Sequence, residues 1–222
     1  MRAGRRAVLA MAAFLLTACA AKAPQRIDYT AFRESRPRSI LVMPPVNLAP
    51  DEKAPTSFLA TATMPLAESG YYVIPVTLSE ETFKQNGMNV AEEAQNVDPG
   101  KLREIFGADA ALYITVNRFG TSYRMLDSVV EAGASAKLVD IRNGRELWQG
   151  QVTMSQSSNQ NNSSGLVGML LSAAVNQISN TLTDRAHEVA GIANYRLLSA
   201  GYENGILYGP YSPKAGTDSN SH

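Results

Sequence analysis

Two strand–helix–strand passages in succession, followed by a hairpin signal, constrain the fold of this chain more than any other feature of its sequence. Short apolar runs predict three strands, which are Ser39–Val46, Tyr71–Val76 and Ala110–Val116. Strands that alternate with helices favour an α/β layer with parallel pairing. Asn143-Gly144 then separates two segments of alternating polarity, roughly Val129–Ile141 and Arg145–Ser155. This pattern predicts that an antiparallel hairpin joins the same sheet.

Local signals predict the helices between the strands. Pro55 to Glu68 has apolar residues at helical spacing, and Pro65 predicts a kink or a break there. Ser79 is expected to cap a short helix through Phe83. Asp98-Pro99 supplies an N-cap acceptor and a proline at the first helical position, and Gly107 predicts the end of that helix.

The longest helical pattern runs from Leu166 to Ser199, where apolar residues recur every three or four positions. Its apolar stripe is expected to dock on the sheet, and Gly168 and Gly191 leave two shorter helices as an alternative. The predicted fold is therefore a single α/β domain. It has a mixed sheet of about five strands with an antiparallel hairpin, flanking helices, a long C-terminal helical segment and a tail.

The N-terminal residues predict a secretory signal with a lipid attachment site. Three arginines precede the apolar run Ala7–Leu16, which as a helix would span about 15 Å of a hydrocarbon core about 30 Å thick. Leu16-Thr17-Ala18-Cys19 resembles the lipobox of bacterial lipoproteins. The resemblance implies cleavage between Ala18 and Cys19 and a covalent lipid on Cys19. Ala20 favours the outer membrane, since an Asp there would resemble an inner-membrane retention signal.

These features divide the chain into four parts. Residues 1–18 are expected to be a signal peptide, and residues 19–38 a lipidated N-terminus and linker. Residues 39–200 are expected to form the globular domain, and residues 201–222, rich in Gly, Pro and Ser, a flexible C-terminal tail.

Composition excludes several classes of function. Lys and Arg number 20, as do Asp and Glu, and this balance argues against a general nucleic-acid binder. Two histidines leave no His-rich metal site, and the single cysteine is taken by the lipid. No metal and no cofactor other than the lipid on Cys19 are therefore expected.

No pattern points to catalysis. His187 has Asp184 nearby, but no Gly-x-Ser-x-Gly elbow accompanies them, so a surface histidine is the better interpretation. Asp140 is interpreted as a turn residue that accepts backbone hydrogen bonds. Trp148 is interpreted as a core residue rather than a stacking platform. We therefore expect no enzymatic activity.

Two segments are candidates for an interaction surface. The first, Leu166 to Val175, is apolar nearly all round and follows a polar stretch. It is either a helix end buried in the core or an exposed patch for a partner, a second copy or the membrane surface. The second, Tyr208-Gly209-Pro210-Tyr211, is either a docking segment or a simple turn. The candidate patch consists of Leu166, Val167, Met169, Leu170, Leu171, Tyr208 and Tyr211.

Several stretches together carry a family resemblance: Ser39–Asn47, Gly70–Val76, Leu138–Gly150 and Leu207–Tyr211. With the lipobox, they are similar to an outer-membrane lipoprotein family of unknown function that includes a neisserial surface lipoprotein. More distantly, the strand order and the Asp-x-x-x-Gly-x-x-x-Trp hairpin resemble the anticodon-binding-like domain. That domain occurs in TolB, in lipoprotein activators of penicillin-binding proteins and in the curli-secretion lipoprotein, where it acts as a periplasmic interaction module.

The resemblance implies a function without catalytic residues. Family members tend to be encoded beside a curli-secretion-like lipoprotein, which implies an envelope assembly or secretion complex. We therefore expect a periplasmic protein-interaction module, anchored in the outer membrane and either facing the periplasm or exposed on the surface. Expected partners are the outer membrane, envelope proteins such as a curli-secretion-like lipoprotein and a second copy of the chain, but not nucleic acid. The alternatives are a regulator of peptidoglycan synthesis and a ligand-binding or hydrolytic envelope protein.

Overall fold

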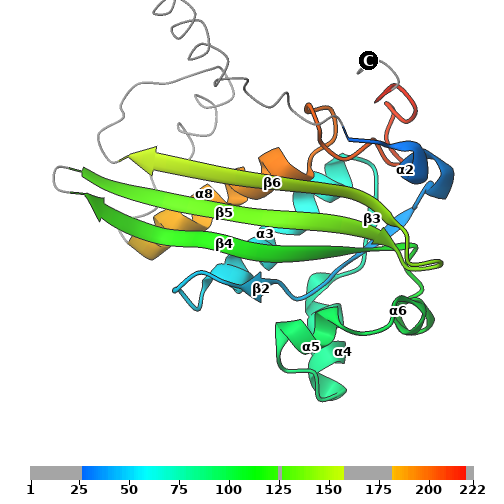
Figure 1. Cartoon of the computed structure of the whole chain (residues 1–222), viewed down its shortest axis with the longest axis horizontal. Coiled ribbons are helices and arrows are strands. Elements are labelled where there is room, and N and C mark those ends of the chain that lie inside the picture. Colours follow the sequence, from blue (N-terminus) through cyan, green and yellow to red (C-terminus); the bar gives the residue numbers. More distant parts are fainter. Residues whose placement is uncertain (1–26, 125–126, 158–181, 219–222) are drawn as a thin grey trace, which may run out of the picture.

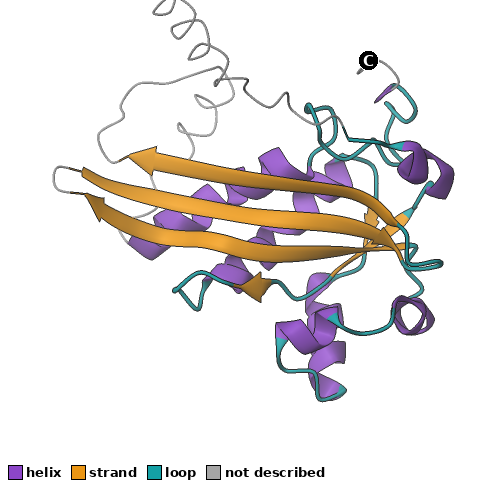
Figure 2. Ribbon diagram, viewed as in Figure 1, coloured by secondary structure: helices purple, strands orange, loops and turns teal. Residues whose placement is uncertain are grey.

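Six strands form one mixed sheet with helices on both of its faces (Figures 1 and 2). The structure is a computed structural model that describes residues 27–124, 127–157 and 182–218. The strands are β1 (Ser39–Val42), β2 (Val46–Asn47), β3 (Tyr72–Val73), β4 (Ala110–Arg124), β5 (Asp127–Asp140) and β6 (Glu146–Ser157). The helices are α2 (Thr30–Ser35), α3 (Ala54–Glu68), α4 (Val76–Gln85), α5 (Ala91–Gln95), α6 (Pro99–Phe106) and α8 (Leu182–Leu198). The predicted α/β class is confirmed.

The strand order is β3-β1-β4-β5-β6, and β2 pairs beside β1 on the same edge of β4. Pairing is parallel from β3 through β1 and β2 to β4, and antiparallel from β4 through β5 to β6. The parallel layer and the hairpin are thus as predicted. β4 is much longer than the predicted strand, since it pairs with β5 as far as Arg124, and a bulge between Val116 and Arg118 shifts the register without ending the pairing.

Proline sets two of the element boundaries. The first predicted strand is divided into β1 and β2 by Pro44 and Pro45, since proline has no N–H to donate. The predicted start of the next helix at Ser79 is wrong. That helix, α4, begins at Val76 directly after Pro75, and the Ser79 hydroxyl donates to the Val76 carbonyl inside it.

The main core lies between the sheet and helices α3 and α8. The inner face of β5 presents Ala132, Ala134 and Ala136, whose small side chains let α8 approach closely. The α8 stripe, which includes Val189 and Ala193, packs there as predicted. The rest of the predicted helical segment, residues 166–181, lies outside the described residues.

Helix α3 is continuous through Pro65, so the expected break is absent and the helix ends only three residues later, at Glu68. On the turn before the proline, the buried Asn194 of α8 donates to the carbonyl of Phe58 (2.7 Å) and to the hydroxyl of Thr61 (2.7 Å). Packing against α8 therefore holds α3 in the two turns that precede Pro65.

The opposite face of the sheet is covered only near the start of β4. There α4, α5 and α6 bury a second cluster around Leu41, Met43 and Tyr113. Helix α6 has the predicted ends: the Asp98 carboxylate accepts from two backbone N–H groups, and Gly107 adopts a left-handed conformation. Beyond this cluster, no helix among the described residues covers that face.

The folded domain extends past both of the predicted boundaries. In the expected linker, Phe32 of α2 is 3% exposed, and in the expected tail Ile206 is 2% exposed. The Tyr71 hydroxyl donates to the Leu207 carbonyl (2.6 Å), and the Gly209 N–H donates to the Ser69 carbonyl (2.8 Å). A Cβ on Gly209 would overlap the Gly70 carbonyl, so only glycine fits. Residues 27–38 and 201–218 therefore belong to the domain.

Candidate functional site

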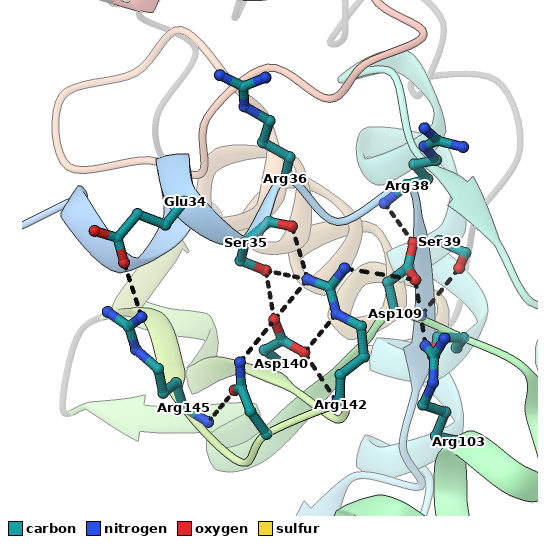
Figure 3. Close-up of polar contacts among 12 residues, drawn as sticks. Glu34, Ser35, Arg36, Arg38, Ser39, Arg103, Asp109, Asp140, Arg142 and Arg145 are labelled. Atoms are coloured by element: carbon teal, nitrogen blue, oxygen red, sulfur yellow. Dashed lines mark hydrogen bonds and ion pairs between the residues drawn. The ribbon is translucent and has the colours of Figure 1, made fainter.

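A network of polar side chains joins the hairpin turn to α2 (Figure 3). Its centre is Asp140 at the end of β5, which is 1% exposed. Asp140 accepts hydrogen bonds from the Ser35 hydroxyl (2.8 Å) and from Nε (2.8 Å), Nη2 (2.6 Å) and the backbone N–H (2.9 Å) of Arg142. The prediction that Asp140 accepts backbone bonds in the turn is confirmed. The hydrogen bonds that Asp140 accepts from the Arg142 guanidinium and the Ser35 hydroxyl were not predicted.

Asp109 and Glu34 extend this network over the same end of the molecule. Asp109 lies 4.0 Å from Nη1 of Arg142 and 3.4 Å from Nη1 of Arg103, and it accepts from the Arg38 backbone N–H (2.9 Å). Glu34 and Arg145 form an exposed ion pair at 2.8 Å. The network therefore ties α2, the start of β1, α6 and the hairpin together.

The electrostatics of Asp140 suit a structural role. Burial alone would raise the pKa of the Asp140 carboxyl, but the hydrogen bonds from Arg142 and Ser35 outweigh burial and hold the pKa below its usual value. The same contacts raise the pKa of Arg142. Both carboxylate oxygens of Asp140 are engaged, Oδ1 by Arg142 and Oδ2 by Arg142 and Ser35, as in a turn that is held together by its side chains.

The other charged candidates are dispersed. His187 is exposed on α8, while the side chain of Asp184 lies outside the described part. Glu80 pairs with Lys84 on the surface of α4, as expected for a solvated face. Within the described residues, no group of three or more His, Cys, Asp and Glu side chains is placed to hold a metal ion.

Strand β6 is the second notable feature, because it forms one edge of the sheet over twelve residues. Among the described residues, nothing pairs with its outer side. Natural edge strands are usually short or protected by charges or proline. β6 has neither kind of residue after Glu146. Within the described residues, the outer backbone edge of β6 is therefore unpaired, which is the arrangement to which a further strand can be added.

A groove of about 1320 Å³ follows β6 and is lined from both faces of the sheet. On the open face stand the exposed side chains of Gln149, Gln151 and Thr153. On the α8 side, Val152 and Met154 are half-buried against the core. The two sides of β6 therefore differ: the open face is polar and includes Lys137, whereas the α8 side is largely apolar and includes Arg196.

The first residues of β6 are held in place by neighbouring segments. Trp148 is 2% exposed, as predicted for a core residue, and its Nε1–H donates to the Asn204 carbonyl (2.9 Å). Gly150 leaves room for the indole, since a Cβ there would overlap the ring. Residues 27–28 and 203–205 line this end of the groove. The part of β6 whose outer edge has no neighbour among the described residues therefore begins near Gln149, and we call it the free stretch.

The sequence-predicted interaction residues are only partly placed. Ala18, Cys19, Leu166, Val167, Met169, Leu170 and Leu171 lie outside the described residues. Tyr208 is half-buried and has the Lys214 ammonium 5.6 Å from its ring centre. Tyr211 is 66% exposed next to it. The role of these residues in binding stays a prediction.

Comparison with known proteins identifies the family. A model of the family described as "Putative lipoprotein GNA1162-like" matches residues 27–211. The chain belongs to this family. A relative from Neisseria meningitidis serogroup B, "Putative lipoprotein NMB1124/NMB1162", is 52% identical over 204 residues, which are 91% of this chain and 94% of the relative. The predicted family resemblance is confirmed. Neither description assigns catalytic residues, and so none are transferred to this chain.

One solved structure of a related lipoprotein has the same fold. The crystal structure of lipoprotein GNA1162 from Neisseria meningitidis is 55% identical and covers 65% of this chain and 100% of its own, with a TM-score of 0.55. More distant structures include a PelC dodecamer from Paraburkholderia phytofirmans (15% identity, TM-score 0.41, 78% of this chain and 90% of its own). Another is the LpoB C-terminal domain from Salmonella enterica (17% identity, TM-score 0.38, 54% of this chain and 83% of its own). No helix in the described ranges is both long and apolar enough to cross a membrane.

Proposed function

We propose that this family member is a lipid-anchored lipoprotein of the outer membrane whose domain binds an extended segment of another envelope protein along β6. The observation that carries the proposal is the edge of β6. This edge is twelve residues long, has no charged residue after Glu146 and lies along the groove. Backbone hydrogen bonds to such an edge supply affinity, and pockets for alternate side chains supply specificity.

The walls of the groove indicate the chemistry of the bound segment. A strand added to β6 would place alternate side chains beside Val152 and Met154 and beside Gln149 and Gln151. The segment should therefore alternate apolar and polar residues, with the polar ones near Gln149 and Lys137 on the open face. Individual backbone hydrogen bonds contribute only about 0.5–1.5 kcal/mol net. Lipid anchoring of both proteins in one membrane would raise their effective concentration and compensate for modest affinity.

The family resemblance supplies a candidate partner. A curli-secretion-like lipoprotein would share the membrane and the compartment, and the complex would serve envelope assembly or secretion. Anchoring itself is tested by labelling cells with palmitate. Wild-type protein should carry the label, and Cys19→Ser should lose it. Label retained on the variant would refute the anchor.

Photocrosslinking in intact cells tests the docking edge. A photoreactive benzoylphenylalanine at Gln149 should give a discrete adduct with another envelope protein. Lysines at Gln151 and Thr153 add charge to the edge and should abolish this adduct. The matched control places lysines at Thr77 and Gln85, which are exposed on α4, and should leave it unchanged.

Two outcomes would contradict the proposed docking edge. An adduct between two copies of this chain would show that the edge mediates self-association instead. An adduct that persists in the Gln151→Lys/Thr153→Lys variant would show that the contact at Gln149 does not depend on the β6 edge. Both results are independent of palmitate labelling, so they leave the anchor to be judged by its own assay.

A further inference from the structure

Five arginines gather at the end of the domain where the chain enters the fold (Figure 3). Two of them precede β1, two belong to the hairpin turn and one to α6: Arg36, Arg38, Arg142, Arg145 and Arg103. We call this set the basic end. All five are exposed at the surface, and they surround the three carboxylates of the polar network.

The basic end has two more arginines than carboxylates. The carboxylates of Glu34, Asp109 and Asp140 interact with Arg145, Arg103 and Arg142. Arg36 and Arg38 point away from this network in Figure 3. In the described part of the chain, neither has a carboxylate partner. Nε of Arg36 donates to the Arg33 carbonyl (3.3 Å), and the Nη groups of Arg36 and Arg38 are placed to bind an external anion.

The distribution of charge over the mature chain is uneven. From Cys19 onwards the chain has 17 basic and 20 acidic side chains. The basic end holds five of the basic ones and three of the acidic ones. The remainder consequently has 12 basic and 17 acidic side chains, an excess of five negative charges. An anionic surface would attract the basic end and repel the rest, which fixes one orientation.

The position of the basic end in the sequence brings it near the membrane. Seven residues separate Cys19 from Ile27, where the described fold begins, so eight Cα–Cα steps join them, and Arg36 follows nine residues later. Eight extended residues reach at most about 28 Å. A lipid on Cys19 would therefore hold the basic end close to the bilayer surface, where phosphate groups are the dominant anions.

We propose that the basic end binds the phosphate groups of anionic phospholipids in the leaflet that holds the anchor, so that the domain lies with this end against the membrane. The inference rests on the proposed lipid anchor for its location. Guanidinium groups suit this role because they form paired hydrogen bonds with phosphate oxygens. Each basic residue near an anionic surface changes the partition coefficient by about fivefold.

Vesicle co-sedimentation tests headgroup binding without the anchor. A chain beginning at Ala20 contains every residue that the structure describes, and with them the whole packed core, but has no lipid. It should sediment with vesicles of phosphatidylcholine containing about one-third phosphatidylglycerol and not with phosphatidylcholine alone. Arg36→Gln/Arg38→Gln should lower the partition coefficient about 25-fold at low salt.

A charge-matched control variant and a competition with inorganic phosphate complete the experiment. Lys53→Gln/Arg118→Gln removes the same charge from exposed positions toward the other end of the sheet and should change binding less than about twofold. Equal losses in both variants, or equal binding to both kinds of vesicle, would overturn the proposal. Competition by inorganic phosphate beyond that of chloride at equal ionic strength would show a free-phosphate site instead.

These results separate the two proposals. The Ala20 chain has no anchor, so loss of palmitate labelling and loss of vesicle binding are independent outcomes. Unchanged Trp148 fluorescence shows that each variant is folded, since this tryptophan is buried in the core.

Discussion

Removal of the Asp140 carboxylate should weaken the whole end of the domain that the hairpin and α2 share. Asp140→Ala abolishes five hydrogen bonds: three from Arg142, one from Ser35 and a long one (3.5 Å) from the Asn143 amide. Hydrogen bonds to charged groups contribute about 1.5–3 kcal/mol each when measured singly, and those of one network are not additive.

The exposure of Arg142 limits the cost of Asp140→Ala. Breaking a fully buried ion pair costs about 3–5 kcal/mol, because the remaining charge stays unpaired. The Arg142 side chain is 33% exposed and lies 4.0 Å from Asp109, so it keeps water and a second carboxylate. We therefore expect a loss of about 2–4 kcal/mol in the free energy of unfolding.

Urea unfolding followed by fluorescence measures this loss directly, because Trp148 is the chain's single tryptophan and is buried. A double-mutant cycle with Arg142→Ala should give a coupling energy of about 1.5–3 kcal/mol. Lys84→Ala, which breaks the exposed pair with Glu80, should change the free energy of unfolding far less than Asp140→Ala, because water screens an exposed pair. A coupling energy below about 0.5 kcal/mol between Asp140 and Arg142 would refute the structural role of the network.

The pH dependence provides a second readout of the same interaction. The folded pKa of Asp140 lies below its unfolded value. The stability that this carboxylate contributes is therefore present above the unfolded pKa, near 4, and is lost as the pH falls through the folded pKa. The difference between wild type and Asp140→Asn should shrink in acid. A difference that is constant from neutral pH to below pH 3 would contradict the assignment.

Two further predictions concern the C-terminal segment and Tyr29, whose hydroxyl donates to the Gly205 carbonyl of that segment (2.6 Å). Gly209→Ala should lower the free energy of unfolding by about 1–3 kcal/mol in urea, because a Cβ there overlaps the Gly70 carbonyl. The control Gly191→Ala, in helix α8 with only an ordinary contact to Thr61, should instead stabilise by about 0.5–1 kcal/mol; equal effects would contradict the close packing. Burial, with a smaller contribution from Asp218, raises the pKa of Tyr29 to about 12. The free energy of unfolding should therefore fall as the pH rises from about 10 to 12. If Tyr29→Phe shows the same fall, this tyrosine is not its cause.

Elements with local signals were predictable from the sequence, and elements that depend on distant contacts were not. Helix α6 has both its N-cap acceptor and its terminal glycine within its own residues. Helix α3, in contrast, continues through Pro65 while Asn194 packs against it from α8. The order of the C-terminal segment also depends on distant contacts. The sequence of residues 205–212 is typical of a flexible segment, and its hydrogen-bond partners lie near Gly70.

The candidate sites divide in the same way. The turn role of Asp140 follows from its neighbours in sequence, but its partner Ser35 is 105 residues away. The β6 edge was also missed, since alternation predicts a strand without revealing its place in the sheet. One signal was present: β6 has no charged residue after Glu146, which a single-sequence search for unprotected strands would have found.

The geometry of the sheet connects the two proposals. β6 begins beside Arg145 of the basic end and runs away from it, and its twelve residues span about 40 Å (Figure 1). If the basic end lies on the membrane, the free stretch from Gln149 onwards projects into the aqueous compartment instead of lying along the bilayer. A partner that is anchored in the same membrane then needs an extended segment long enough to reach from the bilayer to the free stretch of β6. Shortening that segment should weaken crosslinking at Thr153 before it weakens crosslinking at Gln149, whereas equal loss at both positions would indicate that β6 lies parallel to the membrane.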